Sequence, residues 1–281
     1  MRDRFKEEVL KKQWKWGLAV AGLVVWGTLA AVFGLYDLQI SQAAYDPTAR
    51  WAKWFEFAGY LVTPVILAWG AHFLLYRKTR KRRSSLIWIG HCLLATAMLT
   101  AIFFLAGGIN GWVRFGVIGT AYLAGLLIIL LKSWRLDDRR LNAISRIVWR
   151  TFAGCAAVFL VVTVLKTCAG RVRFRELQDL SAYSPWFQWH PLSGNYSFPS
   201  GHTANASGVF GFVLLAPLVR ARWKRVVLCV TPFLFTAVMG MSRVVAGAHY
   251  ASDVLFGMGI AVLVFFALQA VADFWRKKHF W

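Results

Sequence analysis

The sequence is poor in acidic residues and in cysteine. Twelve Asp and Glu stand against 33 Lys and Arg, and the four cysteines are scattered without a pairing or metal-ligand spacing. The chain also lacks an internal repeat, a low-complexity tract and a polar stretch long enough for a separate soluble domain. These absences exclude a disulfide framework, a cysteine-based metal site and a repeat architecture, and we expect the cysteines to be small packing residues.

Long apolar runs occupy most of the chain, which is 58% hydrophobic. A helix that crosses a bilayer needs about 20 mostly apolar residues. Eight runs approach this length: 17–36, 57–76, 86–106, 115–132, 148–165, 203–219, 226–241 and 254–273. We therefore predict an all-α, multi-pass membrane helical bundle of about eight spans. The first run has no clear small-residue cleavage site, which favours a retained anchor over a signal peptide.

The net charge of +21 would suit a nucleic-acid-binding protein, but the placement of the charges argues against that interpretation. Of the 33 Lys and Arg residues, 24 lie in every second connection: 1–16, 77–83, 132–146, 220–225 and 276–278. Basic residues in short loops mark the cytoplasmic side of a membrane protein. The pattern predicts both termini in the cytoplasm, residues 166–202 on the opposite face and no nucleic-acid partner.

Five cations near span ends fall on the predicted outer side: Lys166, Arg171, Arg173, Arg175 and Arg243. A cation inside a bilayer costs about 2.5–3.5 kcal/mol at a helix centre, so its presence calls for an explanation. Arg offers a planar fork to phosphate oxygens, and Lys acts as a point charge. The cluster indicates an anionic partner, while snorkelling to lipid headgroups is the alternative for Arg171 and Arg175.

The segment "SFPSGH", residues 197–202, precedes the sixth apolar run. A helix that begins near Ser200 or Gly201 directs free N–H groups toward an anion. Gly201 lets an oxyanion approach the backbone, and Ser200 can donate its hydroxyl. His202 would then stand where an imidazole can exchange a proton near neutral pH. The simpler interpretation is a helix start with a polar residue near water.

The third stretch, "SRVVAGAHYASD", covers residues 242–253. His249 and Asp253 are four residues apart, so on a helix they share a face. A carboxylate on one imidazole nitrogen fixes the tautomer and leaves the other nitrogen a better nucleophile or base. A purely structural Asp–His pair is the alternative. Together with Arg243 and the two preceding stretches, this one predicts a phosphoryl-transfer site.

These stretches resemble the motifs of the type 2 phosphatidic acid phosphatase superfamily, which shares its site with vanadium haloperoxidases. Lys166 and Arg173 have the spacing of K-x6-R-P, "FPSGH" matches P-S-G-H, and residues 242–253 read as S-R-x5-H-x3-D. The resemblance covers about residues 150–275 and departs from the family at Phe174, where the motif has proline. We accordingly divide the chain into N-terminal transmembrane helices without catalytic motifs, 1–147, and a catalytic core, 148–281.

The resemblance implies dephosphorylation of a lipid phosphate or diphosphate through a phosphohistidine, without metal or cofactor. His249 would attack phosphorus, Asp253 would orient it and His202 would protonate the leaving oxygen. The remaining motif residues would hold the phosphoryl oxygens: Lys166, Arg173, Ser200, Gly201 and Arg243.

Several alternatives stay open at this point. A metal hydrolase that uses His202, His249 and Asp253 as ligands is disfavoured by the surrounding cations, and eight spans argue against a haloperoxidase. A transporter or receptor that binds a lipid phosphate without hydrolysis would more often place its polar residues at mid-membrane. The pattern "NAS" at 205 would put a glycan into the phosphate cradle. That favours a bacterial cytoplasmic membrane with a periplasmic or extracellular site. The sequence indicates neither the particular lipid nor the oligomeric state.

Overall fold

The computed structural model describes residues 2–79, 85–106 and 109–278, and within these ranges it contains helices and no strand. Among these described residues, seven helices are long and apolar enough to cross a membrane. They are α1 (Arg2–Ala44), α2 (Arg50–Thr79), α3 (Ser85–Ala106), α4 (Ile109–Trp134), α5 (Asp138–Ala169), α8 (Arg222–Val245) and α9 (Ala251–Lys278). The predicted all-α, multi-pass membrane bundle is confirmed.

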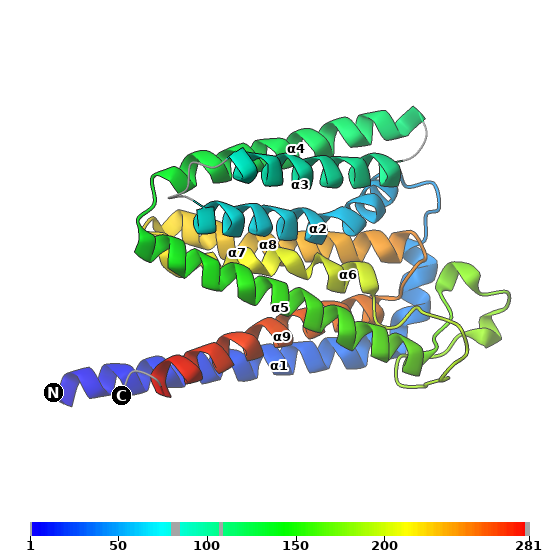
Figure 1. The fold of residues 1–281 in the computed structure, drawn as a ribbon. Coiled ribbons are helices and arrows are strands. Elements are labelled where there is room, and N and C mark those ends of the chain that lie inside the picture. Colours follow the sequence, from blue (N-terminus) through cyan, green and yellow to red (C-terminus); the bar gives the residue numbers. More distant parts are fainter. Residues whose placement is uncertain (1, 80–84, 107–108, 279–281) are drawn as a thin grey trace.

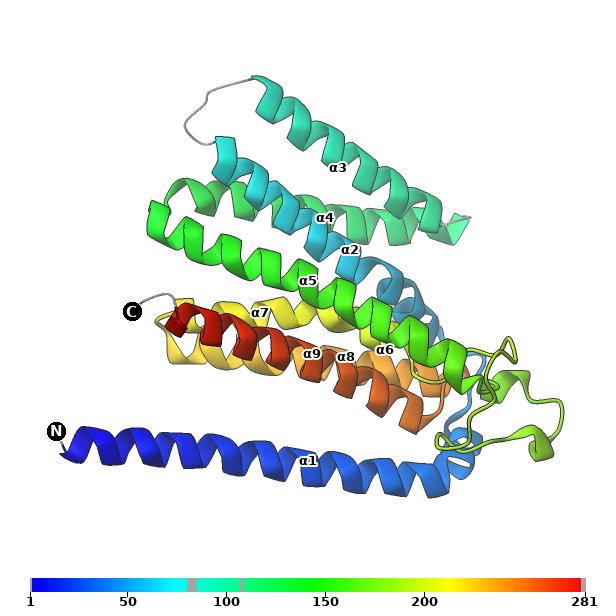
Figure 2. The ribbon, with the colours of Figure 1, turned by 60° about the horizontal axis from the view of Figure 1, so that its bottom comes forward.

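The predicted span 203–219 is not one regular helix. It consists of α6 (Gly201–Asn205), η3 (Ala206–Val209), α7 (Phe210–Leu215) and η4 (Ala216–Leu218). Each piece is too short to count as a span by itself, so length and composition give seven spans rather than eight. Figures 1 and 2 show α6 and α7 running along α8, so this stretch packs in the bundle as a broken series of helices.

Helix α2 lies at the centre of the bundle and packs against α3, α4, α5, α6 and α8, while α1 lies along α9. One apolar core forms between α2, α3 and α4 around Leu61, Ile102 and Tyr122. A second forms between α5, α6, α7 and α9 around Val158 and Phe265. The outer faces of the long helices carry exposed apolar side chains, as expected of a surface in contact with lipid.

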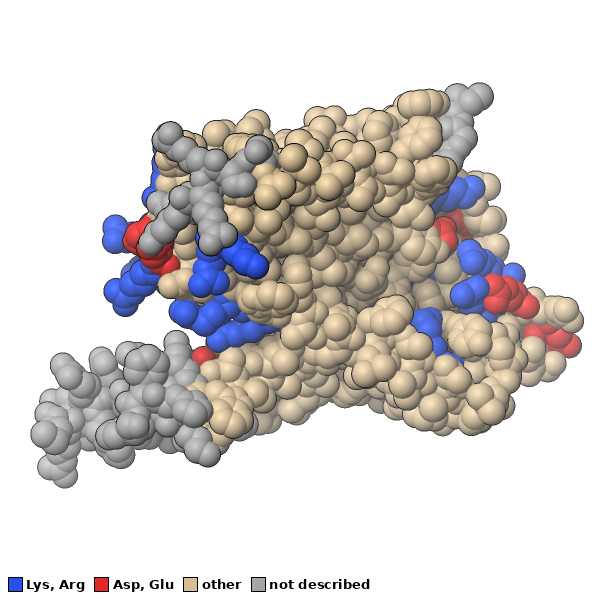
Figure 3. Space-filling model, in the orientation of Figure 1, with Lys and Arg blue, Asp and Glu red and all other residues tan. Residues whose placement is uncertain are grey.

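The charged side chains gather at the two ends of the bundle. Figure 3 shows Lys and Arg at both ends of the visible face, with a belt between them that lacks charge. The start of α1 and the end of α9 lie at one end, and the connection 170–200 lies at the other (Figures 1 and 2). Residues 80–84 of the predicted basic connection lie outside the described residues.

The turn after α5 aims the following residues at the site. The helix begins at the N-cap Asp137, whose carboxylate accepts a hydrogen bond from the N–H of Arg140, and it ends at Gly170. Gly170 has φ 59°, and a Cβ there would lie 1.8 Å from the carbonyl oxygen of His190. Only glycine fits this left-handed, crowded position. The chain can therefore turn back so that Arg171 and Arg173 face the bundle.

Candidate active site

A cavity of about 500 Å³ opens at this end of the bundle, between α2, α5 and α6. Apolar side chains of α5, including Val158 and Val162, form one part of its wall. The acidic, basic and histidine side chains of the lining form another part: Glu56, Lys166, Arg173, Arg175, His202 and His249. Five of the eight predicted site residues line the cavity: Lys166, Arg173, Gly201, His202 and His249. A wall that is cationic on one side and apolar on the other suits an anionic group attached to a hydrocarbon chain.

His249 lies between α8 and α9 and is only 3% exposed. Its Nδ1 is 2.7 Å from the carbonyl oxygen of Ser197, so the ring carries its proton on Nδ1 and donates it to that carbonyl. Nε2 is left as the acceptor nitrogen of a side chain that lines the cavity. Burial lowers the pKa of His249 to about 4, so the ring is neutral at pH 7. A neutral imidazole with a free Nε2 is a nucleophile.

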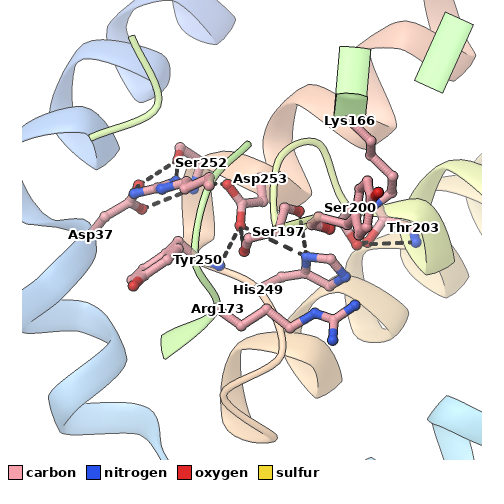
Figure 4. A network of polar contacts seen from close by, with 12 residues as sticks. Asp37, Lys166, Arg173, Ser197, Ser200, Thr203, His249, Tyr250, Ser252 and Asp253 are labelled. Atoms are coloured by element: carbon pink, nitrogen blue, oxygen red, sulfur yellow. Dashed lines mark hydrogen bonds and ion pairs between the residues drawn. The ribbon is translucent and has the colours of Figure 1, made fainter. Parts of the chain in front are cut away.

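Asp253 is fully buried behind His249, and Figure 4 shows how its carboxylate is held. One oxygen accepts from Nη1 of Arg171 at 2.6 Å. The other accepts from the hydroxyl of Ser197 at 2.6 Å and from the N–H of Tyr250 at 2.9 Å. Nδ1 of His249 is 3.7 Å from this second oxygen, beyond hydrogen-bond range. The carboxylate of Asp253 is therefore near the ring of His249 without a direct hydrogen bond to it, and Ser197 contacts both residues.

Arg171 is 1% exposed and joins the site to the first helix. Its guanidinium lies between Asp253 and Asp37 of α1, whose Oδ2 is 3.0 Å from Nη2, and it stacks 3.9 Å from the ring of Tyr250. Asp37 also accepts hydrogen bonds from the N–H and the hydroxyl of Ser252 (Figure 4). The sequence analysis left the role of Arg171 open. It did not identify Asp37 as a site residue, because Asp37 comes directly after the apolar run 17–36 and lies outside the three motifs. Helix α1 continues through it to Ala44.

Three of the residues predicted to hold phosphate lie around His249 in Figure 4: Lys166, Arg173 and Ser200. Lys166 donates to the carbonyl oxygen of Tyr196 at 2.6 Å, and a Cβ at Gly201 would lie 3.1 Å from its Cε. Glycine thus lets the lysine cross the start of α6. Arg173 pairs with Glu176 at 2.8 Å, while its Nε is buried without a partner. A buried donor without a partner is a group that a ligand oxygen can satisfy.

Ser200 and His202 have different positions at the start of α6. Ser200 is buried behind the cavity wall, where its Oγ accepts from the hydroxyl of Thr203 and its N–H donates to the carbonyl oxygen of Asp253 at 2.8 Å. His202 lines the cavity, and its ring meets Tyr60 edge-on with centroids 4.6 Å apart. Its Nε2 is buried without a partner. His202 is therefore placed to exchange a proton with a group in the cavity.

Arg243 is fully buried and does not line the cavity. It donates to the carbonyl oxygen of Ala52 at 2.7 Å and lies 3.3 Å from Glu56. Its charge thus lies directly behind Glu56, whereas Arg175 occupies the wall itself. Among the described residues (2–79, 85–106 and 109–278), no three His, Cys, Asp or Glu side chains lie close enough together to hold a metal ion.

Residues 147–277 match the family model described as the PAP2 superfamily. Over this segment, which is just under half of the chain, the protein is similar to the PAP2 superfamily. The PAP2 segment runs from α5 to α9 and contains all eight predicted site residues. It excludes Asp37 of α1 and Glu56 of α2, which reach the site from outside the matched region.

Bacterial proteins named as lipid phosphatases are similar to part of the chain. A lipid A 1-phosphatase of Rhizobium johnstonii is 34% identical over 122 residues, which are 42% of this chain and 43% of the relative. Phosphatidylglycerophosphatase B of Bacillus subtilis is 31% identical over 78 residues, 27% of this chain and 38% of the relative. The matches thus span about two fifths of each relative's length.

A solved structure also resembles the chain. The crystal structure of a transmembrane PAP2-type phosphatidylglycerolphosphate phosphatase from Bacillus subtilis is 18% identical to it. The superposition covers 87% of this chain and 96% of that one, with a TM-score of 0.37.

Proposed function

We propose that this protein is a membrane phosphatase that removes a phosphate from a lipid phosphate or diphosphate through a phosphohistidine on His249, without a metal. The observation that carries this proposal is the state of His249. Its Nδ1 is tied to the carbonyl oxygen of Ser197, and the side chain lines a cavity that also holds Lys166 and Arg173. Three cations on the wall, Arg175 included, would repel a divalent metal ion and attract a phosphate.

The first step is an in-line displacement. Lys166, Arg173 and the backbone at Gly201 hold the nonbridging oxygens, and Nε2 of His249 attacks phosphorus. As the N–P bond forms, the bond to the lipid oxygen breaks and His202 gives that oxygen a proton. Positioning and charge stabilisation supply most of the catalysis in phosphoryl transfer. Asp253 stabilises the positive charge that the ring of His249 acquires.

The second step restores the enzyme. A water molecule gives a proton to His202, now neutral after the first step and able to act as the base, and attacks phosphorus. The N–P bond breaks, inorganic phosphate leaves and His249 returns to its neutral form. One water molecule is consumed, and the products are a lipid alcohol, or a lipid monophosphate, and phosphate.

The site would face away from the cytoplasm, and both termini would lie in the cytoplasm of a bacterial cell. The charge asymmetry along the chain supports this orientation. The organisms of the relatives above are bacteria. Reporter fusions at residues 80 and 185 test it, since the proposal requires the two reporters to lie on opposite sides.

We also propose that the chain divides into an N-terminal part, 1–147, and a catalytic core, 148–281, because only the second part contains the three motifs. Catalysis would still depend on both parts, since Asp37 and Glu56 contact arginines of the second part. The names of the relatives support a lipid phosphate as substrate, and both lipid A phosphates and phosphatidylglycerol phosphate belong in a substrate panel.

Phosphate release by the purified full-length chain tests the function. In detergent with such a panel, also including phosphatidate and a polyprenyl diphosphate, we expect release from at least one lipid. The variant His249→Ala should release none. A protein that binds a lipid phosphate without releasing phosphate would be the transporter or receptor that the sequence left as the alternative.

A further inference from the structure

A second cavity, of about 880 Å³, lies at the end of the bundle opposite the candidate active site. It opens between the first half of α5 and the second half of α9, and α7, η4 and α8 form its floor. Most of its lining is apolar and includes Phe210, Leu214, Phe233 and Phe265. A hollow of this kind between membrane helices has the chemistry of an acyl-chain site.

Three arginines line the same cavity: Arg139, Arg146 and Arg150. They are seven and four residues apart on α5, so they project from one face of that helix. Arg139 and Arg146 are exposed, and neither makes a hydrogen bond or ion pair from its side chain to another described residue. Figure 3 shows Lys and Arg side chains gathered at this end of the molecule.

Arg150 continues this polar face along α5. It lies about 18 Å along the helix from the first residue of α5. Its Nη1 donates to Gln269 of α9 at 3.0 Å, and Gln269 donates in turn to Asp273 at 3.0 Å. These two hydrogen bonds hold the Arg150 side chain against α9.

The basic part and the apolar part of the cavity wall together suit one ligand that has both an anionic group and a hydrocarbon chain. Among the described residues that line the cavity, Asp273 is the one carboxylate and Arg139, Arg146 and Arg150 are the basic residues. The wall therefore has an excess of positive charge. Apolar side chains below that charge exclude a small hydrated anion as the whole ligand. Basic pockets between transmembrane helices on the cytoplasmic side bind anionic headgroups.

We propose that this cavity binds an anionic phospholipid from the leaflet opposite the active site. Its phosphate would lie between Arg139 and Arg146 with Arg150 below, and its acyl chains would fill the gap between α5 and α9. This proposal does not depend on the proposed phosphatase function.

The chain offers a matched control for the arginines. Arg135 and Arg140 lie at the same end of the bundle and are also exposed, but neither lines the cavity. The double variants Arg139→Gln/Arg146→Gln and Arg135→Gln/Arg140→Gln therefore remove the same charge from the same region. A third variant, Ala143→Phe, fills the wall between Arg139 and Arg146 without a change of charge.

The experiment measures the thermal unfolding of the full-length protein in neutral detergent as lipid is added. A ligand that binds only the folded state stabilises it by RT ln(1 + L/Kd), where L is the free ligand concentration, so the midpoint rises with ligand concentration once that concentration exceeds Kd. Dioleoyl phosphatidylglycerol is the probe, and dioleoyl phosphatidylcholine, glycerol phosphate and inorganic phosphate are the comparisons. Of these four compounds we expect only phosphatidylglycerol to raise the midpoint as its concentration increases, and we expect the same in the His249→Ala variant.

The cavity variants should separate from the control. Arg139→Gln/Arg146→Gln should weaken the apparent affinity by roughly tenfold or more, and Arg135→Gln/Arg140→Gln by less than about twofold. Ala143→Phe should abolish the stabilisation by the lipid. Equal losses in the two double variants would show a diffuse surface charge effect and overturn the proposal. Equal stabilisation by glycerol phosphate, or unchanged binding in Arg139→Gln/Arg146→Gln, would also overturn it.

Discussion

Replacement of Arg171 by Gln tests the buried ion network that ties α1 to the site. The change removes hydrogen bonds to Asp253 (2.6 Å), Asp37 (3.0 Å) and the carbonyl oxygen of Ser184 (2.8 Å). It leaves two fully buried carboxylates without their cation. Removal of one partner from a buried ion pair costs about 3–5 kcal/mol. We expect a loss of stability of this size, together with a loss of phosphate release, because Asp253 could no longer remain ionised in place.

The replacement Asp37→Asn supplies the second half of a double-mutant cycle. In the double variant only one buried carboxylate lacks a partner, so Arg171→Gln should cost less in the Asp37→Asn background than in the wild type. A coupling of about 0.5–3 kcal/mol is expected for groups in direct contact. The measurement is the unfolding free energy of all four proteins in detergent. Additive losses, with no coupling between residues 37 and 171, would refute the network.

The remaining predictions concern the catalytic groups. Because burial holds the pKa of His249 near 4 and attack requires the neutral ring, the acid limb of kcat/KM that His249 sets should lie near pH 4; an acid limb centred at 6.5 would contradict this. His202→Ala should lose on the order of 10²–10⁴ in kcat/KM on an aliphatic lipid phosphate but far less on an aryl phosphate, whose leaving oxygen needs no proton; equal losses on the two substrates would remove His202 as the acid. Arg173→Ala and Arg243→Ala should each lose far more activity than Arg175→Ala, because Arg173 has a buried Nε without a partner and Arg243 sits buried against Glu56; equal losses in all three variants would indicate a diffuse field of positive charge.

The helices could be predicted where an apolar run ends at charged residues. The run 86–106 corresponds to α3 and the run 254–273 lies within α9, because a bilayer span has one dominant requirement, continuous apolar length. The same criterion was misleading at 203–219, which is apolar enough but breaks into α6, η3, α7 and η4. It also put residue 37 into a connection, although α1 continues to Ala44.

The site could be predicted in its residue types but not in its contacts. Lys166, Arg173 and His202 lie on the cavity wall as the motif spacing suggested. The contact between Arg171 and Asp37 joins residues 134 positions apart, and no local pattern reports such a pair. Likewise, i,i+4 spacing suggested a direct bond from Asp253 to His249, whereas the carbonyl oxygen of Ser197 takes that place because the loop before α6 folds under the ring.

Detection of a phosphorylated intermediate on His249 is the most direct test of the proposed phosphohistidine mechanism. The full-length protein is mixed with a lipid phosphate substrate labelled with ³²P and quenched in alkali, which preserves phosphohistidine, and the labelled peptide is identified by mass spectrometry. The account predicts transient label on the peptide that contains His249, loss of that label in acid, and neither label nor turnover in His249→Ala. Turnover that persists in His249→Ala, or label on a different residue, would contradict it.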